Sequence, residues 1–404
     1  MPGTTFYKIL AIAWLSLSWS VAATDFSYSG KVGTEQRYFV DEGQSSHQLG
    51  NSQLSFFINP EFHWQWNDGD DSVIFQPFYR YDKNDDERSH LDIRELSYLH
   101  VGGDWELKLG IRKEYWGVTE FQHLVDVLNQ TDGVDSFDGE QKLGQQMINL
   151  SLVKDWGIVD LYVLPGFRER TFAGETGRLR GPLVVDKSHV SYESSAKKEH
   201  IDVAARWSHS IGDFDLGAYW FHGTNRDPEL IATQVGDKSI LRQYYSQMEQ
   251  VGLDIQATKG DFLWKFESIF RSTNKQDFWA TQAGFEYTHV GLFDSAADLG
   301  LLMEHSWDSR GEGDENSAGA TMQNDLFLGS RLSLNDVQST EVLLGVGADL
   351  EHSATMLMIE ASRRLGESFK ANLDVRIFHS SDMRAPSYYL RNDDYLGLTI
   401  EWYF

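Results

Sequence analysis

The sequence predicts an all-β fold, a transmembrane antiparallel β-barrel of about 18 strands, with 16 strands as the other possibility. Much of the chain alternates between apolar and polar side chains with a period of two, and charged residues gather on the polar face. Aromatic residues make up 13% of the chain, and 35 glycines against 7 prolines suit many strands joined by tight turns. Charges on one face are costly against lipid and cheap against water, so the pattern favours strands between lipid and a wet lumen.

The last ten residues give the clearest strand. Its mixed polar face consists of Tyr395, Gly397, Thr399, Glu401 and Tyr403. Its apolar face consists of Leu396, Leu398, Ile400, Trp402 and Phe404. A strand of a soluble sandwich would alternate in the same way, but this one ends on a phenylalanine. That ending resembles the C-terminal signal of Gram-negative outer-membrane β-barrel proteins. The resemblance implies an outer-membrane location and recognition of these five apolar residues by the barrel-assembly machinery.

The first 23 residues have the pattern of a signal peptide. Lys8 supplies a positive charge, the stretch 9–19 is apolar apart from serines, and Val21, Ala22 and Ala23 precede the expected cleavage site. The apolar run is too short for the alternative, a transmembrane anchor. We therefore expect residues 1–23 to be removed. Residues 24–404 are predicted to form a single outer-membrane β-barrel domain, because no linker or change of composition marks a boundary.

The composition narrows the class of partner. The net charge of −26 argues against nucleic acid. The chain has no cysteines, so packing and strand pairing must stabilise it without disulfides.

The earlier strands show the same two faces in chain order. Apolar residues expected to face outward include Leu54, Phe56, Ile58, Val73, Phe75, Trp105, Leu107, Phe262, Trp264, Leu373 and Val375. Pro60 and Pro77 lie inside strand patterns, and each predicts a bulge or local distortion because proline donates no hydrogen bond to a neighbouring strand. The segment 92–101 cannot be oriented, because the charged Arg94 and Glu95 fall on opposite faces.

The connections predict the number of strands. Short ones lie near 67–71, 102–104, 154–157, 211–213, 259–261, 290–295, 335–338 and 365–368. Longer ones lie near 41–51, 82–90, 117–145, 169–199, 223–244, 272–275, 308–324, 350–354 and 379–392. Their alternation gives about 18 strands. Because this number is even, both chain termini of the barrel lie on the same, periplasmic side. A barrel of this size is wide enough for an aqueous channel.

The segment 112–145 is the most unusual. A strand that ends in Tyr115, Trp116 and Gly117 is followed by a stretch rich in valine, aspartate and asparagine. This combination resembles the third loop region of several porin-like families, including barrels of the alginate-export type, and in porins that loop folds into the lumen. The resemblance implies a pore constriction carrying Glu114, Asp126, Asn129, Asp132, Asp135 and Asp138. A solvated outer loop with a short helix is the alternative that the residues leave open.

A basic wall could face that loop. The basic residues on predicted inner faces are Arg80, Arg112, Arg206, Lys265, Arg271 and Arg376. Acidic residues on the loop opposite basic residues on the wall would set up a transverse electric field that orients and filters polar solutes. Mutual pairing of these charges for structure alone is the other interpretation.

The sequence shows no catalytic motif, so we predict a protein that is not an enzyme and needs no cofactor or metal. The predicted function is a porin-like channel for passive diffusion of small hydrophilic solutes. The alternatives are a polysaccharide exporter of the alginate type, an outer-membrane enzyme, and a structural barrel with a plugged lumen. Expected partners are outer-membrane lipids and lipopolysaccharide, and a homo-oligomer is left open.

Overall fold

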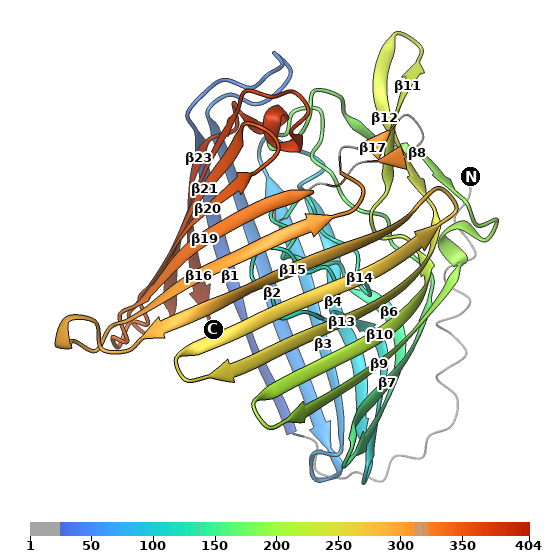
Figure 1. The fold of residues 1–404 in the computed structure, drawn as a ribbon, viewed down its shortest axis with the longest axis vertical. Coiled ribbons are helices and arrows are strands. Elements are labelled where there is room, and N and C mark those ends of the chain that lie inside the picture. The colour runs from blue at the N-terminus through green and yellow to red at the C-terminus, as the bar shows by residue number, and fades with distance from the viewer. Residues whose placement is uncertain (1–24, 136, 312, 315–316, 319, 321) are drawn as a thin grey trace.

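A closed antiparallel β-barrel forms the body of the molecule (Figure 1). The computed structural model describes residues 25–404 except 136, 312, 315–316, 319 and 321. Within these residues, 18 strands belong to one sheet, and each pairs antiparallel with the next along the chain. The ring closes where β1 pairs with β23, from Lys31 opposite Tyr403 to Phe39 opposite Tyr395. The predicted fold class is therefore confirmed, at the larger of the two strand numbers.

The barrel strands follow one another around the ring in chain order. They are β1 (Asp25–Phe39), β2 (Ser52–Trp66), β3 (Asp71–Asp82), β4 (His90–Val101), β5 (Trp105–Arg112), β6 (Gln145–Lys154), β7 (Gly157–Pro165), β9 (Ile201–Ile211), β10 (Phe214–Thr224), β13 (Gln247–Lys259), β14 (Phe262–Thr273), β15 (Asp277–His289), β16 (Asp298–Asp308), β19 (Asn324–Ser333), β20 (Glu341–Asp349), β21 (Ala354–Leu365), β22 (Phe369–Ser380) and β23 (Tyr395–Tyr403).

The remaining elements lie in the connections. They are the small sheet of β8 (Val185–Tyr192), β11 (Glu229–Val235) and β12 (Lys238–Tyr245), the pair β17 (Gly313–Asp314) and β18 (Ser317–Ala318), and the short 3-10 helices η1 (Asn67–Gly69), η2 (Lys197–Glu199), η3 (Leu292–Asp294) and η4 (Pro386–Leu390). None of the helices among the described residues has the length and apolarity needed to cross a membrane. The predicted signal peptide, residues 1–23, lies outside the described residues and stays a prediction.

The connections lie alternately at the two ends of the barrel, and the long ones all lie at the end that we call the loop end, opposite the turn end. The connections 274–276 and 350–353 also lie at the loop end but are short. Asp25 begins β1 and Tyr403 ends β23, so both lie at the turn end. Two of the tight turns use glycine in the left-handed region, with φ of 61° at Gly212 and 60° at Gly260. Residues with a side chain rarely adopt this conformation, which is why glycine precedes Asp213 and Asp261 there.

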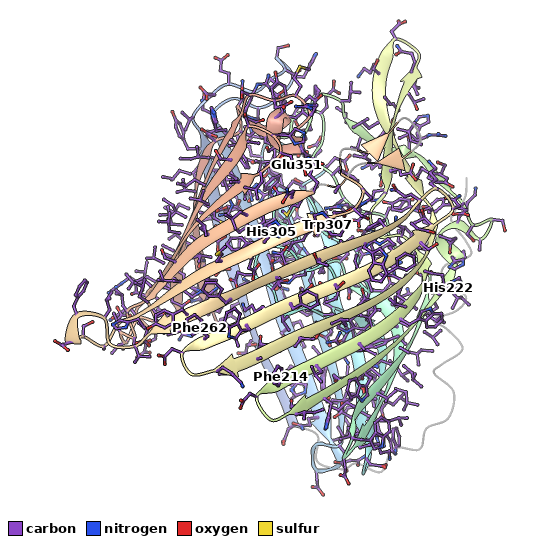
Figure 2. All side chains as sticks on the ribbon, viewed as in Figure 1. Phe214, His222, Phe262, His305, Trp307 and Glu351 are labelled. Atoms are coloured by element: carbon purple, nitrogen blue, oxygen red, sulfur yellow. The ribbon has the colours of Figure 1, made fainter. Side chains whose placement is uncertain are left out.

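The outer and inner faces differ in polarity as predicted. On β14, Trp264 is 49% exposed on the outside, whereas Glu267 is fully buried on the inside. Figure 2 shows Phe214 and Phe262 near the turn end of the outer face and Trp307 nearer the loop end. Aromatic side chains at both ends of an apolar outer face are typical of barrels whose rims meet the two membrane–water interfaces.

Both prolines interrupt strand pairing. The β2–β3 pairing breaks off between Ile58 and Phe62, and Pro60 and Pro77 lie in this gap. On the other side of β3 the register shifts, so that Gln76 pairs with Glu95 while Pro77 pairs with Ile93. The predicted distortions are therefore present.

The same shift orients the segment that the sequence pattern leaves undecided. Arg94 is an extra residue in β4, with no partner on β3. A bulge of this kind lets two successive residues face the same side. Arg94 is 3% exposed inside the barrel, and Glu95 lies 3.9 Å from the inward-facing Arg112. Both charges therefore face the lumen.

Phe404 continues the seam beyond the last strand. Its backbone N–H and C=O each bond to Gly30 at 3.1 Å, and its ring packs against Trp402 at 5.3 Å. The ring lies over Gly30, where a Cβ would come within 2.9 Å of it. Phe404 thus ties the end of the chain to β1.

Deleting Phe404 should lower assembly of the barrel, because it removes two backbone hydrogen bonds and a ring from the closing seam. The measurement is the yield of membrane-inserted protein that shows heat-modifiable migration on gels. Phe404→Tyr keeps the ring and the backbone and should assemble normally. Normal assembly of the deletion would contradict a role of Phe404 as an assembly signal.

An arginine on the outer face should be far more damaging than one on the inner face. Val375→Arg places a charge in the apolar band and should lower the unfolding free energy by about 2–4 kcal/mol. Asn372→Arg lies on the same strand but faces the lumen beside Glu401, and should have little effect. Reversible unfolding in lipid vesicles compares the two, and the opposite ranking would mean that the faces are inverted.

Candidate functional site

The connection between β5 and β6, residues 113–144, folds into the barrel and is called the inward loop below. Five of its residues, Val125, Leu128, Asn129, Gln130 and Asp132, are no more than 1% exposed. Burial to this degree requires wall contacts on several sides. The inward loop therefore occupies the lumen and is not a solvated outer loop.

Glu267 of β14 holds the first part of the inward loop. Its carboxylate accepts hydrogen bonds from the backbone N–H groups of Val118 at 2.7 Å, Thr119 at 3.0 Å and Val125 at 3.2 Å. The Thr119 hydroxyl donates a further bond at 2.7 Å. Buried backbone N–H groups outside a sheet need such acceptors. A fully buried carboxylate with four donors therefore anchors the loop to the wall.

Glu304 of β16 provides a second anchor. It accepts hydrogen bonds from the backbone N–H groups of Glu120 at 2.8 Å and Phe121 at 3.1 Å. The Phe121 ring stacks on Phe327 of β19 with centroids 4.7 Å apart. The Glu120 side chain contacts Lys265 at 3.5 Å and also pairs with Arg331.

The later part of the inward loop reaches the opposite wall. Asp132 lies 2.7 Å from Arg94, and Asp135 lies 2.7 Å from Arg80 and 3.1 Å from Arg94. Asp138 contacts Arg376 of β22 at 3.5 Å. β4 and β16 lie on opposite sides of the ring. The loop therefore crosses the lumen from wall to wall.

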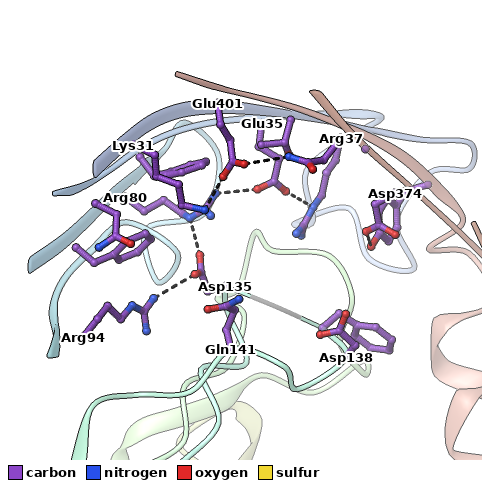
Figure 3. Close-up of a pocket in the computed structure, with 18 of the residues that line it drawn as sticks. Lys31, Glu35, Arg37, Arg80, Arg94, Asp135, Asp138, Gln141, Asp374 and Glu401 are labelled. Carbon is purple, nitrogen blue, oxygen red and sulfur yellow. Dashed lines mark hydrogen bonds and ion pairs between the residues drawn. The ribbon is translucent and has the colours of Figure 1, made fainter. Parts of the chain in front are cut away.

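Two different environments result on the two sides of the loop. Towards β6–β15, apolar side chains of the loop form one cluster with inward residues of the wall: Trp116, Val125, Val127 and Leu128 with Met147, Tyr162, Leu164, Ala204, Tyr219, Phe221, Met248, Ile269, Phe278 and Ala280. Towards β1–β4, β22 and β23, charged side chains line a cavity of about 290 Å³ (Figure 3). The apolar side is packed against the wall, and the charged side holds the open space.

The residues predicted to form the constriction divide between these environments. Asp135 and Asp138 line the cavity. Asp126 is buried within the loop, 3.4 Å from Lys142, and burial raises its pKa. Asn129 braces the loop, donating to the carbonyls of Arg112 at 2.8 Å and Leu143 at 2.9 Å.

The other two residues of that set also serve local contacts. Asp132 is fully buried against Arg94, as described above. Glu114 stands beside Arg112 at 3.2 Å, near the start of the loop. The structure thus brings two of the six predicted side chains to the cavity, and a loop without periodicity gave no signal to separate them from the rest.

The predicted basic residues face inward, but each is paired with acid. The shortest distances between charged atoms are Arg80–Asp135 at 2.7 Å, Arg112–Glu114 at 3.2 Å, Arg206–Asp254 at 2.7 Å, Lys265–Glu120 at 3.5 Å, Arg271–Asp227 at 2.9 Å and Arg376–Glu360 at 2.5 Å, and Arg80 and Arg376 also contact Glu35 at 2.8 Å and Asp374 at 2.9 Å. They are spread around the ring and do not form one wall opposite the loop. Strand alternation predicts the face of a residue and not its partner on another strand.

Several important residues were not singled out from the sequence. Glu267, Glu304 and Glu35 are among them, because the alternation along a strand does not show which inward side chains bind the loop. Arg88, in the connection after β3, is buried with Glu35 at 2.9 Å and Asp82 at 2.9 Å. No group of His, Asp or Glu side chains in the described part of the chain is arranged to hold a metal ion.

Comparison with known proteins gives the fold. No family model and no curated protein matches the sequence. The Escherichia coli outer-membrane protein Wzi, a carbohydrate-binding β-barrel involved in group 1 capsule assembly, has 10% identity and a TM-score of 0.53, over 94% of this chain and 84% of Wzi. This chain therefore has the fold of an outer-membrane β-barrel.

Porins give weaker matches. A mutant porin of Rhodopseudomonas blastica has 12% identity with a TM-score of 0.45, covering 94% of this chain and all of the porin. A loop-deletion mutant of OmpT, an outer-membrane protein of Vibrio cholerae, has 11% identity and the same TM-score, covering 95% of this chain and 100% of that one.

Glu267→Ala should release the inward loop from the wall, because several buried donors lose their acceptor. Leaving buried donors unsatisfied costs roughly 1–3 kcal/mol each, so we expect a loss of about 3 kcal/mol or more in unfolding free energy. Limited trypsin digestion should also cut at Lys142, which is 9% exposed in the native fold.

Glu106→Ala is the matched control, because Glu106 faces the lumen and pairs with Lys108 at 3.4 Å, away from the loop. Equal stability and equal digestion of the two variants would show that Glu267 does not anchor the loop.

Proposed function

We propose that the protein is an outer-membrane channel of a Gram-negative bacterium, for passive diffusion of small hydrophilic solutes. The observation that carries the proposal is the charged cavity between the inward loop and the wall of β1–β4, β22 and β23. The apolar outer face with aromatic rims supports a location in lipid. The signal-peptide pattern of residues 1–23 supports export.

The inward loop would set the size limit of the channel. A barrel of this strand number encloses an aqueous lumen when nothing fills it. Here the apolar cluster joins the loop to β6–β15, so passage would be confined to the opposite side. The cavity of about 290 Å³ admits small solutes. Discrimination would come from width and charge, without a chemical step.

A polysaccharide exporter and a plugged structural barrel are the alternatives. Carbohydrate sites commonly offer free aromatic faces, but two cavity rings are covered by cations, with Arg80 over Phe57 at 4.9 Å and Arg94 over Phe78 at 4.3 Å. This favours small solutes over a sugar polymer. The cavity itself favours a channel over a plug.

Removing residues 120–142 should enlarge the single-channel conductance in a planar lipid bilayer, because the segment crosses the lumen. Removing 233–239, the tip of the hairpin β11–β12 that projects from the loop end (Figure 1), should leave conductance unchanged. Heat-modifiable migration would check that both variants are folded. An unaltered conductance after the first deletion would contradict the size limit, and a wild-type barrel that never conducts would contradict the channel.

A further inference from the structure

We infer that the cavity selects small organic solutes that carry an oxyanion, a carboxylate or a phosphate, through Arg37 and Lys113 in its lining. The inference deepens the proposed function and rests on the same cavity. It concerns which solutes the cavity prefers, and a binding measurement tests it independently of conduction.

The charges around the cavity are unlike those of the whole chain. The chain carries a net charge of −26. The cavity is lined by six basic side chains, those of Lys31, Arg37, Arg80, Arg94, Lys113 and Arg376, and by five acidic ones, those of Glu35, Asp135, Asp138, Asp374 and Glu401. The lining thus carries one more basic than acidic side chain, although the protein as a whole is strongly acidic. An excess of Arg and Lys is typical of pores and sites for anions.

The acidic side chains of the cavity have cationic partners. Glu35 contacts Arg88 at 2.9 Å as well as Arg80, and Glu401 contacts Lys31 at 2.6 Å. Arg376 lies against both Asp374 and Asp138, and Asp135 lies between Arg80 and Arg94, at the distances given above. These carboxylates are therefore compensated by the wall and the loop, and they repel an entering anion little.

Two cations keep unused donors. Arg37 contacts Glu35 through its Nε at 2.5 Å and lies over the Tyr395 ring at 5.5 Å. Its two terminal nitrogens have no hydrogen-bond partner among the described residues. Figure 3 shows the Arg37 side chain pointing into the cavity towards the loop.

Lys113 is the second such cation. No described residue forms an ion pair or hydrogen bond with its ammonium group, although the residue is partly buried. Burial, together with the nearby Arg94, lowers the pKa of Lys113. A partly buried cation outside any ion pair is unfavourable, and the nearby carboxylates of Glu95, Asp92 and Asp135 offset this cost only in part, so an anion beside Lys113 would relieve it further. Lys113 therefore gains more from an anionic solute than a solvated lysine would.

The size and shape of the site limit the class of solute. A guanidinium with two free terminal nitrogens matches the paired oxygens of a carboxylate or a phosphate. The cavity volume of about 290 Å³ lies at the lower end of the range for ligand sites, roughly 300–1,000 Å³. Small organic anions fit these limits, and long polymers do not.

Isothermal titration calorimetry on the full chain in detergent micelles tests the inference. The probes are glucuronate, glucose 6-phosphate and uncharged glucose, which share a ring and differ in the anionic group. The wild type should bind one or both anions more tightly than glucose, and the stronger of the two identifies the preferred oxyanion. Arg37→Gln and Lys113→Gln should each weaken that binding about tenfold, as expected for a lost charge-assisted hydrogen bond.

Two controls keep the result interpretable. Lys113→Arg retains the charge and should retain binding, whereas Lys187→Gln removes an exposed loop charge outside the cavity and should change nothing. Equal binding of glucose and both anions, or unchanged binding in both Gln variants, would overturn the inference. A protein that conducts ions without binding these anions leaves the channel standing and removes the anion site. A protein that binds these anions without conducting ions leaves the anion site standing and removes the channel.

Discussion

Closure of the strand ring between β1 and β23 is the constraint on which the rest of this structure depends. In a bilayer, an unpaired strand edge would leave backbone donors and acceptors with neither water nor a partner. β1 meets this constraint by pairing with β2 on one side and β23 on the other, and Phe404 extends the second pairing to Gly30. Closure also fixes which side of every strand faces inward, and so decides which charges share the lumen.

Once the ring is closed, the lumen has its own requirements. A loop inside the lumen has backbone N–H groups that cannot pair with the backbone of the sheet. The side-chain carboxylates of Glu267 and Glu304 accept hydrogen bonds from them. The inward acids and bases of the wall compensate one another and the loop, so burial of many charges is tolerable. Apolar packing then joins the loop to one half of the wall. The cavity, with the two cations that keep unused donors, lies on the other half.

Much of this architecture could be predicted from period-two alternation and turn composition, because each strand must present one face to each solvent. The number of strands, the connections and the inward side of Arg376 and Lys265 followed from that rule. Arg94 and Glu95 did not, because a bulge breaks the period. The partners of the inward charges were also out of reach, since they depend on register across the ring. Asp126 and Asn129 were expected to line a pore. The sequence of a loop has no repeating pattern that separates side chains facing water from side chains that are packed.

The anchoring of the inward loop has a consequence for the order of folding. Thr119 and Phe121 bind carboxylates that lie 148 and 183 residues further along the chain, on strands in the second half of the barrel. The loop leaves the ribosome long before its acceptors exist, and it cannot dock until those strands have taken their places. Its backbone groups must stay hydrated until then. Docking of the loop, and with it the filling of the lumen, therefore follows the placement of β14 and β16.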